Sequence, residues 1–448
     1  MRYLPSAPEE NRALLDAIGV KSAEDLLCGI PESMRLKAPL NLPAKSSELD
    51  VLRQLEAMAG QNTKFSSRFL GAGAYAHFIP SAIDMLTSRQ EWFTAYTPYQ
   101  PEISQGTLQH IFEYQTLICD LTGLDVSNAS MYDGGTSCLE AALLAVRVQK
   151  KKNTILVSSG LHPHYQEVIR TNITPRDGLK LVRVALKDGV TDLEDLKAKL
   201  NQDVACFLVG YPNFLGSIED TAAISEVTKS AGTLLVSVTQ EAMALGWLEA
   251  PGKSGADMAC GEAMSFGNPT SFGGPFLGFL AVKDGYKREM PGRIVGQTHD
   301  LNGKRGFVLT LASREQHIRR DKATSNICSN QALIALRANI FLQFAGPEGL
   351  KGLAMQNAAK AQYLQSKLLE TGKFETVFAA PYFNEFVIRY KGKANTLYEA
   401  CLAKGILPGL PLDQYYESLT DCMLWCATEL NTKQEIDELA AFAANVKA

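Results

Sequence analysis

The sequence predicts an α/β protein with a mainly parallel sheet in a large domain and a smaller C-terminal α+β domain. Apolar strand candidates alternate with amphipathic helical stretches through the middle of the chain, and this alternation favours right-handed βαβ crossovers. The strand candidates are Thr154–Ser158, Lys180–Ala185, Val204–Gly210, Thr233–Val238, Ala256–Cys260 and Leu277–Val282. The helices between them include Leu193–Leu200 and Thr221–Ser230.

Three regions follow one another along the chain. Residues 1–60 are polar and helix-prone and are interrupted by prolines, so we expect an N-terminal helical arm. Residues 61–328 carry the alternation of the large domain, and residues 329–448 should form the small domain. Its expected elements are the helical stretches Asn330–Ala345 and Gly349–Glu370, the strand Glu385–Tyr390 and the helix Lys433–Val446.

Composition narrows the class of protein. The chain of 448 residues is 46% hydrophobic and 21% charged, which is typical of a globular protein. Its net charge of −4 argues against nucleic acid as a partner. No stretch approaches the length of a membrane span and the N-terminus lacks a signal peptide, so we expect a cytoplasmic protein without a membrane partner. The nine cysteines contain no CxxC pair, and we expect reduced thiols and no metal site.

The segment from Gly255 to Phe279 reads GADMACGEAMSFGNPTSFGGPFLGF and has the layout of a cofactor-binding turn. It resembles the turn of aspartate-aminotransferase-like enzymes, the pyridoxal phosphate (PLP) enzymes of fold type I, where a lysine forms a Schiff base with the cofactor. Met264 stands at the position of that lysine. A thioether cannot condense with an aldehyde, so we expect no cofactor bound covalently to this chain.

A second motif lies at the start of the apolar helix that runs to about Val148. Its members are two glycines and two hydroxyl residues, Gly134, Gly135, Thr136 and Ser137. Their backbone N–H groups and hydroxyls could hold a cofactor phosphate. A capped helix start explains the same residues equally well.

Two further features belong to the same predicted pocket. His162 or His164 resembles the ring that stacks on the PLP pyridine in that family, although a lone histidine is more often a core or surface residue. The pyridine nitrogen usually needs an aspartate after a central strand, whereas here the nearest carboxylate is Glu241. Because both the lysine and the aspartate are missing, we expect a vestigial cofactor pocket.

A polar and aromatic strip precedes the helix Thr107–Thr122. Its residues are Tyr96, Tyr99, Gln100, Glu102, Ser104 and Gln105, and prolines at 98 and 101 restrict its backbone. Core packing would favour aliphatic residues, so the wall of a site explains the strip better. The upstream run from Phe69 to His77 matches the dinucleotide fingerprint G-x-G-x-x-A only formally, because no good strand precedes it and no acidic residue follows at the required distance.

Together these motifs closely resemble the P-proteins of the glycine cleavage system, which are glycine decarboxylases. The resemblance covers about residues 60–345, includes Tyr211–Asp220 and Arg319–Cys328, and weakens towards the C-terminus. Met264 matches the lysine-lacking chain of the two-chain bacterial P-proteins. The resemblance therefore implies a homologous lysine-bearing partner, P-protein subunit 2, which holds the PLP.

The resemblance also implies a reaction and a role. The complex would decarboxylate glycine and transfer the aminomethyl group to the lipoyl arm of H-protein, while this chain, inactive alone, binds and orients. The residues that would reach the partner's site are His77 and the strip, above all Tyr96, Tyr99, Gln100 and Glu102. Two alternatives stay open: a purely structural or regulatory subunit without contact to substrate, and an independent PLP enzyme that uses Lys253.

Overall fold

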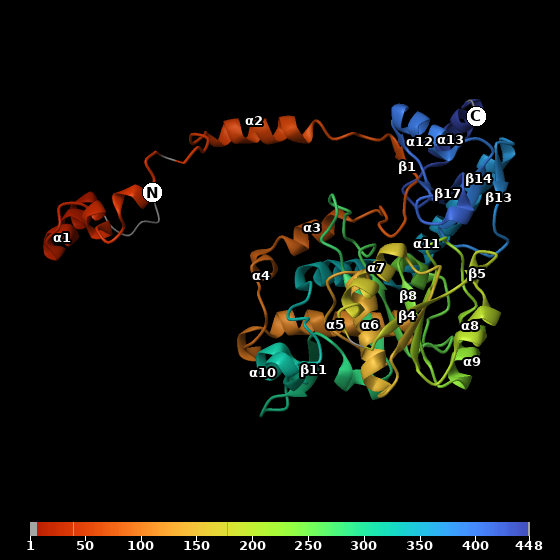
Figure 1. Cartoon of the computed structure of the whole chain (residues 1–448), viewed down its shortest axis with the longest axis horizontal. Helices are drawn as coiled ribbons and strands as arrows, with labels where there is room; N and C mark the ends of the chain where they lie inside the picture. Colours follow the sequence, from red (N-terminus) through yellow and green to blue (C-terminus); the bar gives the residue numbers. More distant parts are fainter. Residues whose placement is uncertain (1–6, 39, 177, 447–448) are drawn as a thin grey trace. The chain divides into compact units, whose positions relative to one another are not determined.

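The computed structural model describes residues 7–38, 40–176 and 178–446 of the chain (Figure 1). The chain forms two compact units, Met1–Thr63 and Lys64–Ala448. Among the residues that the structure describes, no helix is both long and apolar enough to cross a membrane.

The first unit consists of short helices without a core. Its elements are α1 (Pro8–Ile18), η1 (Ala23–Leu27), η2 (Glu32–Met34) and α2 (Glu48–Ala59). Helix α1 begins at a proline, whose fixed φ suits the first turn, and ends at Gly19 in the left-handed conformation. None of the described residues of this unit is buried. The structure thus has helices where the sequence predicts a helical arm.

A seven-stranded sheet forms the centre of the second unit, in the order β2-β10-β9-β8-β7-β3-β4. The strands are β2 (Val126–Ser127), β3 (Thr154–Ser158), β4 (Lys180–Val184), β7 (Val204–Gly210), β8 (Leu234–Thr239), β9 (Met258–Glu262) and β10 (Gly278–Val282). Neighbours from β4 to β9 are parallel, which confirms the mainly parallel sheet. Strand β10 runs antiparallel to β9 and β2, because residues 263–277 between β9 and β10 form no crossover helix.

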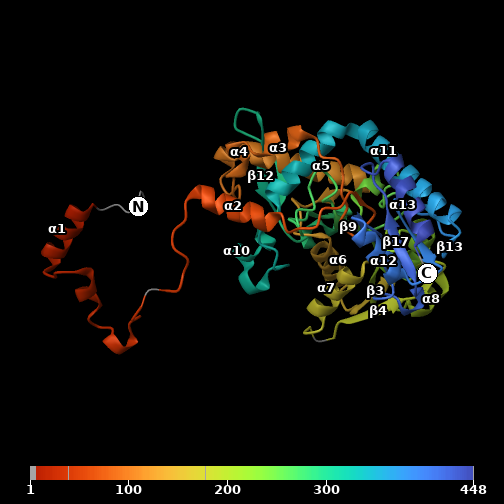
Figure 2. The ribbon, with the colours of Figure 1, turned by 90° about the horizontal axis from the view of Figure 1, so that it is seen from above.

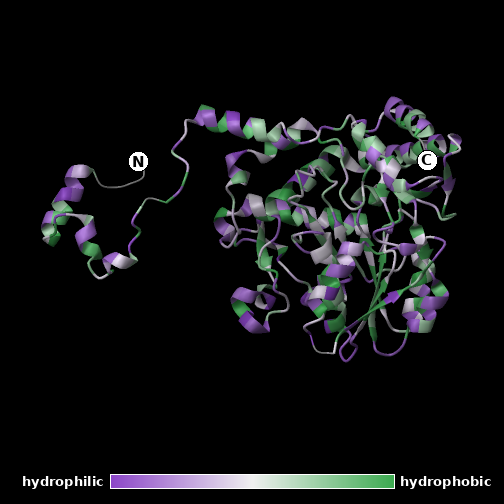
Figure 3. Ribbon diagram, turned by 45° about the horizontal axis from the view of Figure 1, so that its top comes forward, coloured by the Kyte–Doolittle hydropathy of each residue, from purple (hydrophilic) through white to green (hydrophobic). Residues whose placement is uncertain are grey.

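Helices cover both faces of this sheet (Figure 1). They are α5 (Gln105–Thr122), α6 (Gly134–Val148), α7 (Pro163–Ile173), α8 (Leu193–Lys199) and α9 (Thr221–Ser230). Side chains alternate across β3: Ile155 and Val157 pack with α6 and α7, whereas Leu156 packs with α8 and α9. Figure 3 shows the hydrophobic residues concentrated in the strands of the sheet.

A four-stranded antiparallel sheet with two helices follows in the C-terminal part. Its order is β13-β14-β17-β16. The elements are β13 (Phe374–Thr376), β14 (Glu385–Tyr390), α12 (Ala394–Ala403), β16 (Leu410–Pro411), η8 (Glu417–Leu419), β17 (Cys422–Cys426) and α13 (Lys433–Asn445). Helix α13 packs along the second half of α11 (Ala332–Glu370) around a core of its own (Figure 2). Helix α11 is interrupted at Gly346, directly before Pro347 and between the two predicted helical stretches.

Short elements complete the second unit. They are β1 (Ser67–Arg68), α3 (Ser81–Thr87), α4 (Gln90–Phe93), η3 (Pro101–Ile103), β5 (Leu186–Lys187), β6 (Val190–Thr191), η4 (Ala242–Gly246), η5 (Asp284–Glu289), β11 (Ile294–His299), β12 (Arg305–Thr310), η6 (Ala312–Arg314), α10 (Gln316–Arg319), η7 (Arg320–Lys322) and β15 (Ile406–Leu407). Strand β1 pairs with β15, so residues just after the first unit lie beside the C-terminal part. The predicted domain boundaries at residues 60 and 328 stay predictions.

The turn after β7 joins the central sheet to the C-terminal part. Asn213 accepts hydrogen bonds from the backbone N–H groups of Leu215 and Ser217. Gly216 has a φ of +81°, and a Cβ atom added there would lie 2.1 Å from the backbone oxygen of Glu385. Only glycine fits both the left-handed backbone and this close approach.

We expect Gly216→Ala to destabilise the protein more than Gly303→Ala. Gly303 also has a positive φ, but a Cβ atom there meets nothing within 4 Å. The control should lose about 1 kcal/mol from backbone strain. Gly216→Ala should lose about 1–3 kcal/mol more because the methyl group forces the two parts away from each other. Urea unfolding measures both losses of unfolding free energy. Equal losses would show that the backbone around Gly216 and Glu385 accommodates the methyl group without an additional loss of stability.

Candidate functional site

A cavity of about 370 Å³ lies at the carboxyl edge of the central sheet. This edge is where open α/β sheets bind their ligands. The lining residues are Ala72, Gly73, Ala74, Asp133, Gly134, Gly135, His162, His164, Tyr165, Glu262 and Phe276. The structure therefore brings four residues of the predicted vestigial pocket together: Gly134, Gly135, His162 and His164.

Glu262, the last residue of β9, places its carboxylate at the start of α6. Its Oε2 accepts the backbone N–H of Gly134 at 2.9 Å. Its Oε1 accepts the N–H groups of Met264 at 3.0 Å and of Leu277 at 2.7 Å. Burial raises the pKa of Glu262 to about 7, while these three N–H groups act in the opposite direction. The carboxylate is thus an integral part of the cavity wall.

Asp133, the residue directly before α6, caps the N-terminus of the same helix. Its carboxylate accepts the backbone N–H of Thr136 at 2.7 Å and the Thr136 hydroxyl at 2.9 Å. The Ser137 hydroxyl donates to the backbone oxygen of Asp133 at 2.8 Å. The structure thus contains the capped helix start, which is one of the two interpretations of this motif. Thr136 and Ser137 do not line the cavity.

Both ring nitrogens of His162 have partners. Nδ1 accepts the backbone N–H of His164 at 3.1 Å, so Nε2 carries the proton and donates to the Ala72 oxygen at 3.0 Å. Burial lowers the pKa of His162 to about 4. Its ring stacks on Tyr165 at a centroid distance of 4.7 Å and contacts Phe214 edge-on. His162 is a neutral ring that the protein itself already surrounds.

The residues around the cavity do not fit a covalently bound PLP. Met264 is buried, and no lysine is found among the described residues that line the cavity. Lys253 is exposed and precedes β9, whereas Glu262 ends it, so roughly 15 Å of extended strand separates that lysine from the cavity edge. The described residues also include no group of three or more His, Cys, Asp or Glu side chains that could hold a metal ion.

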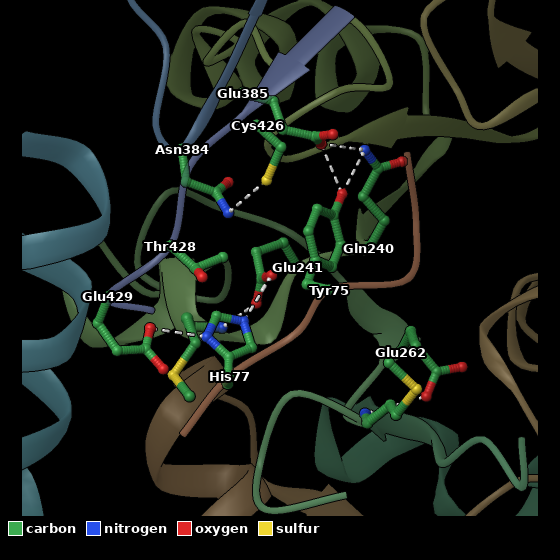
Figure 4. A network of polar contacts seen from close by, with 12 residues as sticks. Tyr75, His77, Gln240, Glu241, Glu262, Asn384, Glu385, Cys426, Thr428 and Glu429 are labelled. Atoms are coloured by element: carbon green, nitrogen blue, oxygen red, sulfur yellow. Dashed lines mark hydrogen bonds and ion pairs between the residues drawn. The ribbon is translucent and has the colours of Figure 1, made fainter. Parts of the chain in front are cut away.

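Glu241 lies outside this cavity, in a buried network with His77 (Figure 4). Its Oε2 is 3.1 Å from Nε2 of His77, and Oε2 of Glu429 is 2.9 Å from Nδ1. Burial alone would lower the pKa of His77, but the two carboxylates outweigh it and raise the pKa to about 10. His77 is therefore a charged imidazolium that donates to both carboxylates.

A second buried carboxylate in Figure 4, that of Glu385, holds the run from Phe69 to His77, which we call the glycine-rich run. Glu385 accepts the backbone N–H of Ala72 at 2.6 Å and the Tyr75 hydroxyl at 2.6 Å. Gln240 donates to the Tyr75 oxygen at 3.2 Å. Burial raises the pKa of Glu385 to about 7. This segment is thus held by hydrogen bonds between the central sheet and β14.

The strip divides into an exposed and a structural part. Tyr96, Tyr99, Gln100 and Glu102 are exposed, with 81% of Tyr96 accessible to solvent. The Gln105 amide instead donates to the Phe307 oxygen and accepts the Phe307 N–H, both at 2.9 Å, and so holds β12. Ser104, which is half-buried, precedes α5 and makes no side-chain cap bond.

Sequence reasoning missed the buried carboxylates that organise the site. Glu262 had a local signal, because it is a charged residue that follows the apolar strand candidate and stands two positions before Met264. Glu385 and Glu429 had none, because their partners in the glycine-rich run lie more than 300 residues away along the chain.

His77→Gln should destabilise the protein by about 3–5 kcal/mol near neutral pH, because two buried carboxylates then lose their cation. The folded pKa of His77, about 10, exceeds the ordinary 6.5. The stabilisation by the charged ring is therefore complete below about pH 6.5 and disappears as pH rises towards 10. The difference in unfolding free energy between wild type and variant should shrink over this range in urea titrations. His299→Gln, an exposed control, should show no such trend, and a pH-independent difference would mean that His77 is neutral.

Comparisons with known proteins agree with this architecture. The family model of the glycine cleavage system P-protein matches residues 1–442. A relative from Anoxybacillus flavithermus, a probable glycine dehydrogenase (decarboxylating) subunit 1, is 49% identical over 440 residues, which are 98% of this chain and 97% of the relative.

Solved structures show the same relationship. A crystal structure of glycine decarboxylase (P-protein) of the glycine cleavage system, in inhibitor-bound form, has a TM-score of 0.91 at 40% identity and covers 100% of both chains. A NifS-like protein, at 15% identity and a TM-score of 0.62 over 85% of this chain and 98% of its own, shares the fold alone. The predicted fold type I of PLP-dependent transferases is confirmed. The chain belongs to the glycine cleavage system P-protein family.

Proposed function

We propose that this chain is the subunit without the cofactor lysine in a two-chain glycine decarboxylase. Its partner, a homologous lysine-bearing subunit 2, holds the PLP. Together they decarboxylate glycine and pass the aminomethyl group to the lipoyl arm of H-protein. The observation that carries the proposal is Met264 at the lysine position, beside a cavity whose described lining contains no lysine.

The geometry of the cavity supports a non-covalent role. The N–H of Gly134 and both ring nitrogens of His162 already have partners within the chain. A cofactor would find neither an amine for a Schiff base nor an unpaired donor on Gly134 or on the His162 ring. We infer that the isolated chain is inactive.

The exposed part of the strip is the best candidate for contact with the partner's site. Four polar or aromatic side chains there, Tyr96, Tyr99, Gln100 and Glu102, are exposed beside the exposed Ile103. Large exposed side chains next to one another are typical of an interaction surface. Gln105 and His77 have internal partners instead, so we assign them to holding β12 and the glycine-rich run in place.

Borohydride reduction of the co-expressed complex tests the position of the cofactor. The phosphopyridoxyl group should be found on the partner chain alone, because only that chain offers a lysine in a cofactor cavity. Mass spectrometry of each polypeptide identifies the labelled residue. A label on Lys253 or any other lysine of this chain would make it an enzyme in its own right.

Substitutions in the strip test its contact with the substrate site. Tyr96→Ala and Glu102→Gln should lower kcat/KM of the complex for glycine by roughly tenfold or more, which corresponds to about 1.4 kcal/mol of lost positioning. Glu399→Gln, at an exposed position on α12, serves as the matched control and should change little. Size-exclusion chromatography checks that the complex still forms. Unchanged activity of an intact complex would favour a purely structural or regulatory subunit.

A further inference from the structure

We infer that the Glu262 side chain takes the place of a cofactor phosphate at the start of α6, so that this chain excludes PLP and free phosphate from its own cavity. The inference rests on the proposed function, in which the partner holds the cofactor. It names one residue, and the hydrogen bond that this residue makes, as the reason why this chain does not bind the cofactor itself.

The start of α6 is a place that attracts an anion. Helix α6 has 15 residues, and the unpaired N–H groups and the dipole of such a helix favour a negative group at its N-terminus. The Glu262 carboxylate fills that role through its bond to the Gly134 N–H. It is almost completely buried, with an exposed fraction of 3%. The start of the helix therefore has an acceptor from within the chain.

The carboxylate is held firmly in this position. Glu262 ends β9 and pairs in the sheet with Gly278 of β10. Its second oxygen accepts two further backbone N–H groups, those of Met264 and Leu277. A Cβ atom added to Gly134 would lie only 3.1 Å from the Glu262 Cβ. The strand end and the helix start are thus in close contact, and the side chain cannot swing aside without losing three hydrogen bonds.

The donors of Thr136 and Ser137 in the motif are also engaged. Asp133 takes the N–H and the hydroxyl of Thr136, and its backbone oxygen takes the Ser137 hydroxyl. A phosphate entering here would meet the acidic side chains of Asp133 and Glu262 in a partly buried wall of the cavity. Negative charges there repel a phosphate more strongly than they would in water. Electrostatics and hydrogen bonding therefore both oppose its binding.

The His162 ring, which also lines the cavity, already has close neighbours within the chain. A Cβ atom added to Gly73 would lie 2.7 Å from Nε2 of His162, so the glycine-rich run lies directly against the imidazole. Tyr165 stacks on the ring and Phe214 contacts it edge-on. A pyridine ring would therefore have to compete with these neighbours for the imidazole, and under the proposed function PLP stays with the chain that has the lysine.

Two substitutions of Glu262 test the inference in the full-length chain. Glu262→Gln keeps the shape and the acceptor for Met264 and Leu277, but presents an NH2 group to the Gly134 N–H. Glu262→Ala empties the position. Glu219→Gln is the matched control, because Glu219 is also buried and also accepts a backbone N–H, that of Thr191.

The probes are inorganic phosphate and pyridoxine 5′-phosphate, which lacks the aldehyde and cannot react with surface lysines. Calorimetric titration should show no binding to wild type and to Glu219→Gln. For Glu262→Ala it should show phosphate binding with a Kd at least roughly tenfold below the weakest Kd that the titration can detect. The gain in affinity should be smaller for Glu262→Gln. Circular dichroism confirms that each variant is folded.

Three results would overturn the inference. They are binding of either probe to wild type as tight as to Glu262→Ala, no gain in folded Glu262 variants, and a phosphate at the Gly134 N–H in crystals of wild type soaked with phosphate. Binding of either probe to wild type at the Gly134 N–H would overturn the inference even if both variants misfold. Failure here is separate from failure of the proposed function, which is decided by the borohydride label on the partner.

Discussion

The carboxyl edge of the parallel sheet sets the constraint on which the site depends. Strand ends and the helix that starts beside them bring unpaired backbone N–H groups into a buried region, and each such group needs an acceptor. In this chain the acceptors are its own carboxylates: Glu262 for α6 and the turn after β9, and Glu385 for the run at Ala72. The chain's own side chains thus supply acceptors for these N–H groups at the sheet edge.

The buried charges also connect parts of the second unit that are distant in sequence. His77 lies between Glu241, which follows the central strand β8, and Glu429, which follows β17. Breaking the ion pairs of a buried cation with two carboxylates is costly, because charged groups would be left buried and unpaired. The network therefore keeps the glycine-rich run in a fixed position against both sheets.

Much of the fold could be predicted from the sequence, because its signals are local. The predicted strands at Thr154–Ser158, Val204–Gly210 and Glu385–Tyr390 and the helix at Thr221–Ser230 have the bounds seen in the structure. The antiparallel direction of β10 could not be predicted from the sequence, because the apolar pattern of a strand does not show whether it runs parallel or antiparallel to its neighbours. It depends on the turn before the strand, which contains no helix.

The site was predicted only where its parts are close in sequence. Two glycines of α6 line one cavity with His162, the cap residue of α7, and His164, while their role in a cofactor pocket stays a prediction. His77 was grouped with the strip through the family resemblance, and Glu241 with the pocket as the carboxylate nearest a strand end. The structure instead joins these two residues across 164 positions. Partners of this kind are set by tertiary packing and leave no trace in a single sequence.

The position of Glu262 next to Met264 also bears on how such a chain can evolve. Met264→Lys alone would place an ammonium group near a carboxylate that is bonded to the Met264 N–H itself. Such a lysine would stay protonated as an ion pair, and a protonated amine is not a nucleophile. Under the proposed function, the single change Met264→Lys would therefore not give this chain the cofactor chemistry assigned to its partner.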